Sequence, residues 1–113
     1  MMCELTELRG MTVLVGGDHP IGEVSDLILD RIGETALGFD VRAYSGRHYF
    51  LPLALTLMSN GRLAAASPLH LVEDVDYYRR RGLSVSWPAA GAARVELLSG
   101  RILPGGDPAG SSA

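Results

Sequence analysis

The sequence predicts a mainly β fold, in which a small, strongly bent, antiparallel β-barrel is followed by one C-terminal α-helix. Between residues 10 and 66, short apolar segments alternate with turns that contain Gly, Asn or Ser, as is typical of consecutive strands. After residue 66 the apolar residues recur with the spacing of a helix instead. A chain of 113 residues fits one domain with a single hydrophobic core.

The first two strands are expected on either side of a glycine-containing turn. Residues 11–15 (MTVLV) are apolar and β-branched, and residues 21–30 (IGEVSDLILD) form a second, longer segment. The alternation of apolar residues in this second segment breaks near Ser25, which predicts a β-bulge there. Gly22, inside the same strand, indicates that another stretch of backbone passes close by.

The third strand shows the clearest alternation in the chain. In residues 36–42, Leu37, Phe39 and Val41 are expected on a buried face, and Asp40 lies on the opposite face with the other even-numbered positions. This pattern is typical of a half-buried strand, so the sequence predicts that the face carrying Asp40 is turned away from the core.

Two further hairpins are predicted downstream. Residues 47–53 (RHYFLPL) form the next strand, and Pro52 marks its end or an edge position because proline cannot donate a backbone hydrogen bond. Asn60 and Gly61 lie between two apolar segments, which is a strong hairpin signal.

A helix is predicted over residues 68–81. Ser67 is a good N-cap, Pro68 suits the first helical position, and Gly82 is a plausible end. One apolar stripe is expected to pack on the barrel or on a second subunit. Its members are Leu71, Val72, Val75 and Tyr78.

The remaining segments carry weaker signals. Residues 1–9 are expected to form a frayed N-terminal lead-in that contains the single cysteine, Cys3. Residues 83–103 are interpreted as an extension with short strands. Residues 104–113 (PGGDPAGSSA) are small, polar and rich in Gly and Pro, and are predicted to be a flexible tail.

The central segment resembles a PRC-barrel domain. The match covers about residues 8–66. It consists of glycines and apolar residues at family spacing, namely Gly17, residues 21–24 (IGEV), residues 26–30 (DLILD), Gly33, residues 37–41 (LGFDV), Gly46, Arg47 and residues 51–53 (LPL). The resemblance implies a PRC-barrel-like β-domain over residues 10–66 that docks onto other proteins, and a stand-alone bacterial protein rather than an enzyme.

Composition narrows the function classes. The net charge is −3 and the ten basic residues are all Arg, so the chain lacks the basic excess of an autonomous nucleic-acid binder. No apolar segment approaches the length of a membrane-spanning helix, and no signal-peptide pattern is present, which together predict a cytoplasmic protein without a membrane span.

Catalytic and metal-binding patterns are missing from the sequence. The histidines lack metal-ligand spacing and are expected to be surface or interface side chains, and Asp18 beside His19 reads as a solvated turn. We therefore expect no catalytic residue, no metal and no cofactor. The acidic side chains of the second strand are expected to face solvent and to keep an edge soluble. The residues concerned are His19, His48 and His70, and Glu23, Asp26 and Asp30.

One basic and aromatic cluster is a candidate interaction surface, because Arg and Tyr are enriched at interface hot spots. It comprises Tyr77, Tyr78, Arg79, Arg80 and Arg81, with Trp87 nearby. A protein partner is the leading interpretation. The alternatives are an RNA- or ribosome-associated factor that uses Arg79–Arg81, and a small-ligand sensor. A homodimer is also expected, because the alternating segment from Leu83 to Trp87 could add to a sheet edge.

Overall fold

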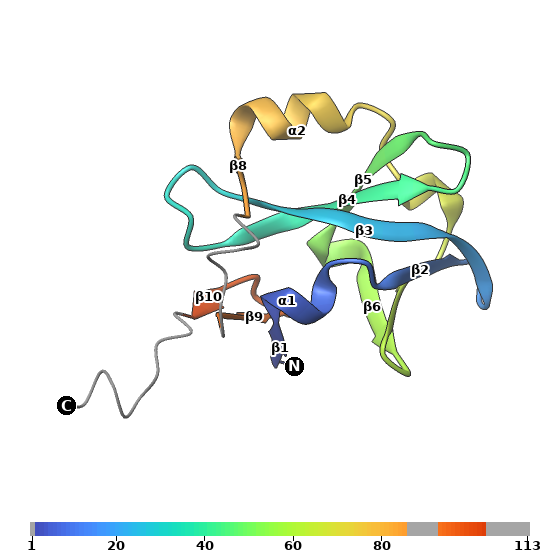
Figure 1. Ribbon diagram of the computed structural model, residues 1–113, viewed down its shortest axis with the longest axis horizontal. Helices are drawn as coiled ribbons and strands as arrows, with labels where there is room; N and C mark the ends of the chain where they lie inside the picture. The colour runs from blue at the N-terminus through green and yellow to red at the C-terminus, as the bar shows by residue number, and fades with distance from the viewer. Residues whose placement is uncertain (1, 86–92, 104–113) are drawn as a thin grey trace.

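The computed structural model describes residues 2–85 and 93–103 (Figure 1). A curled sheet forms a half-barrel, with a helix on one side and a small three-stranded sheet on the other, so the predicted mainly β, bent fold with a C-terminal helix is confirmed. The large sheet contains β2 (Thr12–Val15), β3 (His19–Leu29), β4 (Ala36–Ala43), β5 (His48–Pro52), β6 (Thr56–Ser59), β7 (Arg62–Ala65) and β8 (Leu83–Ser84). The small sheet contains β1 (Met2–Glu4), β9 (Arg94–Glu96) and β10 (Ile102–Leu103).

The strand order of the large sheet explains its curl. The order is β5-β4-β3-β2-β7-β6, and β8 pairs with the end of β3. The first and last strands of this order, β5 and β6, are joined in sequence by one 3-10 turn, η1 (Leu53–Leu55). Because so short a link spans only about 10–15 Å, the two ends of the sheet must bend toward each other. One pair, β2 with β7, is parallel, which corrects the prediction of an entirely antiparallel sheet.

Local signals in the strands predicted the backbone well. The register of β3 against β4 shifts between Val24 and Asp26, where a bulge was expected. A Cβ on Gly22 would collide with the carbonyl oxygen of Arg42, so the predicted close approach is confirmed. Asn60 and Gly61 have φ angles of 50° and 74°, as a type I′ hairpin requires.

The inside of the half-barrel is filled with apolar side chains. Strand residues with almost no exposure meet there, namely Val13, Val24, Leu27, Phe39, Val41, Leu51 and Leu63. Residues expected to be a frayed lead-in join the same core, because Leu5 and Leu8 of the short helix α1 (Leu5–Leu8) are buried beside Cys3 and Val95. The segment at residues 1–9 is therefore structured from Met2, since its apolar side chains close the base of the half-barrel.

The predicted helix over residues 68–81 is shorter and divided. Ser67 caps a single 3-10 turn, η2 (Pro68–His70), and the α-helix α2 (Val75–Arg81) has its own N-cap, Asp74, whose carboxylate accepts from the Tyr77 N–H. Between them, Val72 exchanges backbone hydrogen bonds of 2.7 and 2.8 Å with Phe50. The helix breaks there because this β-branched residue completes a bridge to the sheet instead.

Gly82 ends α2, but not in the left-handed conformation typical of a terminal glycine. A Cβ at this position would collide with the Leu29 carbonyl oxygen and lie 2.8 Å from Ile28 Cγ2. The glycine is required because the chain leaves α2 pressed against β3, where Leu83 and Ser84 then pair.

Candidate protein-interaction surface

The helical repeat divides the predicted interaction residues between two faces of α2. Val75, Tyr78 and Arg79 lie at positions i, i+3 and i+4 and face the sheet, whereas Tyr77, Arg80 and Arg81 face outward. We call the latter three residues the outer face of α2. Trp87 lies outside the described residues.

The inward face of α2 packs on the side of the sheet away from the main core. Tyr78 stacks on Phe50 with ring centroids 3.7 Å apart and an interplanar angle of 7°. Ile28, Phe50 and Val75 are buried together in this second cluster. Tyr78 therefore anchors the helix, and a partner cannot use its ring face while α2 stays docked.

Arg79 is also committed to the sheet. It pairs with the carboxylate Oδ2 of Asp40, which is completely buried, and Nδ1 of His48 lies 2.8 Å from Oδ1 of the same carboxylate. Asp40 was expected on a face turned away from the core, and His48 was expected to be a surface or interface side chain. The expectation for Asp40 is corrected, because α2 and its arginine cover this face of β4, whereas the His48 side chain remains 37% exposed.

This Asp40 cluster could have been found from the hairpin geometry. Arg42 pairs with His48 across the turn between β4 and β5, and positions of equal parity share a face, so His48 lies diagonally opposite Asp40. The contribution of Arg79 had no local signal, because it comes from a helix 39 positions later in the sequence.

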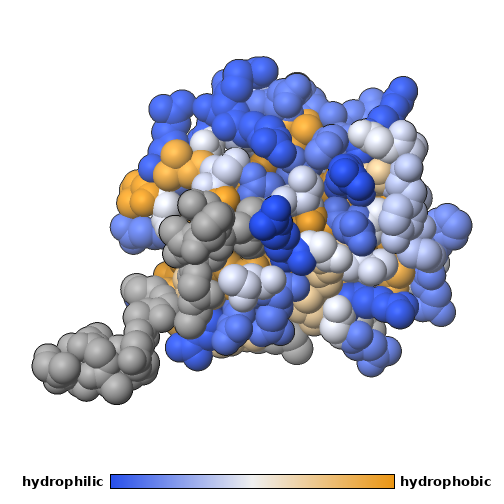
Figure 2. All heavy atoms as spheres, in the orientation of Figure 1, coloured by the Kyte–Doolittle hydropathy of each residue, from blue (hydrophilic) through white to orange (hydrophobic). Residues whose placement is uncertain are grey.

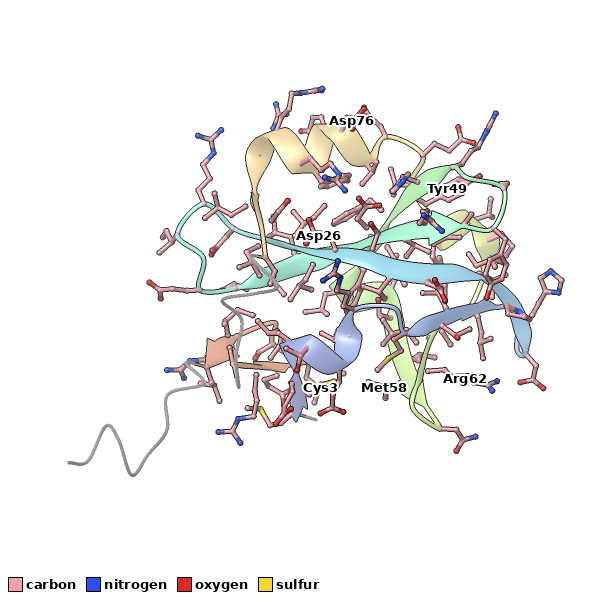
Figure 3. The ribbon with its side chains drawn as sticks, in the orientation of Figure 1. Cys3, Asp26, Tyr49, Met58, Arg62 and Asp76 are labelled. Carbon is pink, nitrogen blue, oxygen red and sulfur yellow. The ribbon has the colours of Figure 1, made fainter. Side chains whose placement is uncertain are left out.

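The acidic residues of β3 are not uniformly solvent-facing, and β3 is a central strand rather than an edge. Asp26 is buried and accepts hydrogen bonds from the N–H groups of Leu27 (2.8 Å) and Val85 (3.2 Å), so it fixes the segment that follows α2. Figure 3 shows Asp26 between β3 and α2. It lies opposite Asp40 across the two strands, which places two carboxylates under one helix. Glu23 is exposed, as predicted.

Asp30 shapes the turn that follows β3. Its Oδ1 accepts from the N–H groups of Gly33 (2.7 Å) and Glu34 (3.0 Å). Partial desolvation acts to raise the pKa of Asp30, but hydrogen bonds from the backbone of the turn outweigh it and hold the pKa below its ordinary value. This carboxylate is therefore a structural element of the turn.

The Asp40 cluster, which comprises Asp40, His48 and Arg79, borders the surface of the protein. Its His48 and Arg79 line a shallow hollow of about 420 Å³ together with Glu73 and Asp76. Among the described residues, the hydrogen-bond partner of the His48 imidazole is Asp40 rather than a Ser, Thr or Cys side chain. Within residues 2–85 and 93–103, no group of three or more His, Cys, Asp or Glu side chains could hold a metal ion.

The outer face of α2 continues onto the turn between β3 and β4. The guanidinium of Arg81 stacks 3.8 Å from the centre of the Tyr77 ring, and Arg31 donates to the Arg80 carbonyl oxygen at 3.5 Å. Ile32 in this turn is 76% exposed. Leu83 of β8 is also exposed and lies beside Gly33 of the turn. Figure 2 shows this apolar patch at the left edge of the molecule, bordered by the hydrophilic surface over α2.

A separate apolar groove of about 790 Å³ lies at the opposite end of the sheet. It runs between the turn before β3, the turn between β4 and β5, and η2, and is lined mainly by apolar and aromatic side chains. Leu69 on its rim is 90% exposed, and His19, also exposed, lies in its lining. Val15 in its lining belongs to the main core, and Ile21 and Leu71 pack against that core, so the groove opens at one end of the half-barrel.

Comparison of the chain with protein-family models and with curated proteins finds no match. In the part of the chain that the structure describes, no helix has the length and apolar character needed to cross a membrane.

Proposed function

We propose that this chain is a non-enzymatic protein-docking module of the PRC-barrel type, acting in the bacterial cytoplasm, and that its partner binds the outer face of α2. The single observation that carries this proposal is the division of α2, which reserves Tyr78 and Arg79 for the sheet and leaves Tyr77, Arg80 and Arg81 outward. Apolar side chains fill the inside of the half-barrel. We therefore favour docking of a partner on the outer surface rather than binding of a ligand inside the barrel.

The composition of this surface indicates the chemistry of the partner. Arg81 stacks on the ring of Tyr77, Arg31 donates to the carbonyl oxygen of Arg80, and Ile32 and Leu83 are exposed nearby. A protein segment with carboxylates and a few apolar side chains fits such a surface, because Arg binds carboxylates in bidentate fashion and exposed apolar groups gain from burial. RNA is the alternative, since the same guanidinium groups bind phosphate.

The test is affinity capture from the native cells, followed by measurement of the dissociation constant for the captured partner. Arg80→Glu combined with Arg81→Glu is expected to weaken binding by at least about tenfold, the effect of losing one typical hot-spot residue. Arg79 is left unchanged because it holds Asp40. The matched control reverses the charge of two exposed arginines elsewhere, Arg42 on β4 and Arg62 on β7. This control should bind the partner as the wild type does.

The outcome also separates the two partner classes. Binding of purified RNA that weakens steeply with salt, and that the double variant abolishes, would favour the RNA alternative. Equal binding of a captured protein by the double variant and the wild type would contradict the proposed site on α2.

A further inference from the structure

The two edges of the large sheet differ in how they are protected. At β5, the backbone of Phe50 pairs with Val72, so the segment between η2 and α2 covers that edge. At the other end of the strand order, β6 pairs with β7, and in the described part of the chain no strand pairs with its outer edge. Figure 1 shows the hairpin of β6 and β7 extending below the sheet, away from α2.

The open edge lacks the features that usually prevent strand pairing. Residues 53–61 (LALTLMSNG) contain no charged side chain, and β6 contains no proline. Leu57 is 60% exposed, and Leu98, which is 91% exposed, lies beside it across an apolar hollow of about 180 Å³. An uncharged edge strand with apolar side chains around it is suited to pairing with another strand.

The hairpin geometry fixes which backbone groups the open edge presents. In a two-residue type I′ hairpin, the residues that flank the loop exchange both hydrogen bonds, so Ser59 and Arg62 do so here. Because the direction of the backbone groups alternates, Leu57 also faces β7, whereas Thr56 and Met58 face outward. The Thr56 N–H is already bonded to the Leu53 carbonyl oxygen. The edge therefore offers the N–H of Met58 and the carbonyl oxygens of Thr56 and Met58.

We propose that a second copy of this chain pairs with β6 in antiparallel orientation, about a two-fold axis at Leu57. In this register, Leu57 lies opposite Leu57 of the partner subunit, and each Met58 N–H donates to the Thr56 carbonyl oxygen of the other copy. A second copy is the favoured occupant because the strand complements itself. Its outward N–H donor meets an outward carbonyl acceptor, its exposed leucine meets the same leucine of the other copy, and no like charges meet at the axis.

The register predicts a specific cross-link. A non-hydrogen-bonded antiparallel pair has its Cα atoms about 4.5 Å apart, within the range that a disulfide spans. In a Cys3→Ala background, Leu57→Cys should form a covalent dimer under mild oxidation, seen on non-reducing gels. Leu69→Cys, which replaces an exposed leucine at the opposite end of the sheet, should run as a single chain on the same gels. Equal cross-linking of the two variants would overturn the proposed register.

Sedimentation equilibrium tests the dimer without any cysteine variant. The wild type should sediment with the mass of two chains, and Leu57→Lys should halve that mass while the circular dichroism spectrum is unchanged. Leu69→Lys, which adds the same charge elsewhere, should remain dimeric. A wild type that sediments as one chain at every concentration, or a dimeric Leu57→Lys, would overturn the proposal. Reversing the charges of Arg80 and Arg81 should not change the sedimented mass. The experiments can therefore contradict the proposed dimer without contradicting the proposed docking site on α2, and the reverse.

Discussion

Asp40 is fully buried, although its position in the alternating pattern of β4 predicts an exposed side chain. A polar residue that alternates with apolar ones in a strand is normally exposed, because the strand usually has one face in water. Here both faces are covered, the main core lying under Phe39 and α2 lying over Asp40. Sequence alternation reports only that the two faces of a strand differ. Whether another element covers the polar face depends on long-range packing, which no local pattern contains.

The buried carboxylate is tolerated because each of its oxygens has a partner. Arg79 neutralises it, and His48 bonds the other oxygen. Asp26 lies opposite on β3, and two carboxylates facing each other would destabilise the sheet without a nearby cation. Arg79 therefore compensates for a concentration of negative charge, in addition to holding α2.

We expect Arg79→Ala to lower the free energy of unfolding by about 2–3 kcal/mol, because it leaves a buried carboxylate without its cation. The change would be measured by urea denaturation followed by circular dichroism. Arg80→Ala, which removes the neighbouring outward arginine, should change the free energy of unfolding by no more than about 0.5 kcal/mol. Equal losses in the two variants would show that the pairing with Asp40 contributes nothing to stability.

At the level of elements, local chemistry predicted most strands correctly but placed the start of the α-helix incorrectly. The bulge near Ser25 and the hairpin at Asn60 were predictable because each depends on a few neighbouring residues. The start of α2 was not, because Ser67 and Asp74 are both good N-caps and the choice between them is made by the bridge from Val72 to Phe50. Tertiary pairing thus overrode a valid capping signal.

The N-terminal elements offer a second test. Burial raises the pKa of the Cys3 thiol, and the nearby charges of Glu7 and Glu4 raise it further. Because the thiolate is the reactive form, Cys3 should react slowly with Ellman's reagent in the folded protein and quickly in urea. The rate in urea is the control for intrinsic reactivity. A fast native reaction would mean that β1 and α1 open readily and contribute little to the core.

At the level of the whole molecule, the segments outside residues 10–66 complete the core. The three-residue strands β1 and β9 pair with each other in register, and Val95 is fully buried beside Leu5 and Leu8. Strands this short carry no periodicity, so the sequence could not predict this small sheet as a unit. The interaction residues on α2 were predicted as a group, but their division between two faces required the docked position of the helix.

A fragment of residues 10–66 should therefore fail to fold cooperatively, although it contains the whole segment that the sequence predicts as the β-domain. It would expose the core surface that Leu5, Leu8 and Val95 cover, together with Phe50 on the other face. Urea titration should give no cooperative transition for the fragment, and a sharp one for the full chain. A fragment as stable as the full chain would show that the flanking elements are dispensable.

The pairing of Met2 with Glu96 also sets an order of events during synthesis. β1 leaves the ribosome before its pairing strand β9, which is made only after α2 is complete. Until β9 is made, the core that buries Leu5 and Leu8 is incomplete. Their apolar side chains are therefore exposed in the nascent chain, where chaperones can bind them. Contacts so distant in sequence form slowly. Closing the base of the half-barrel is thus a late step, which cannot begin before residue 96 has emerged from the exit tunnel.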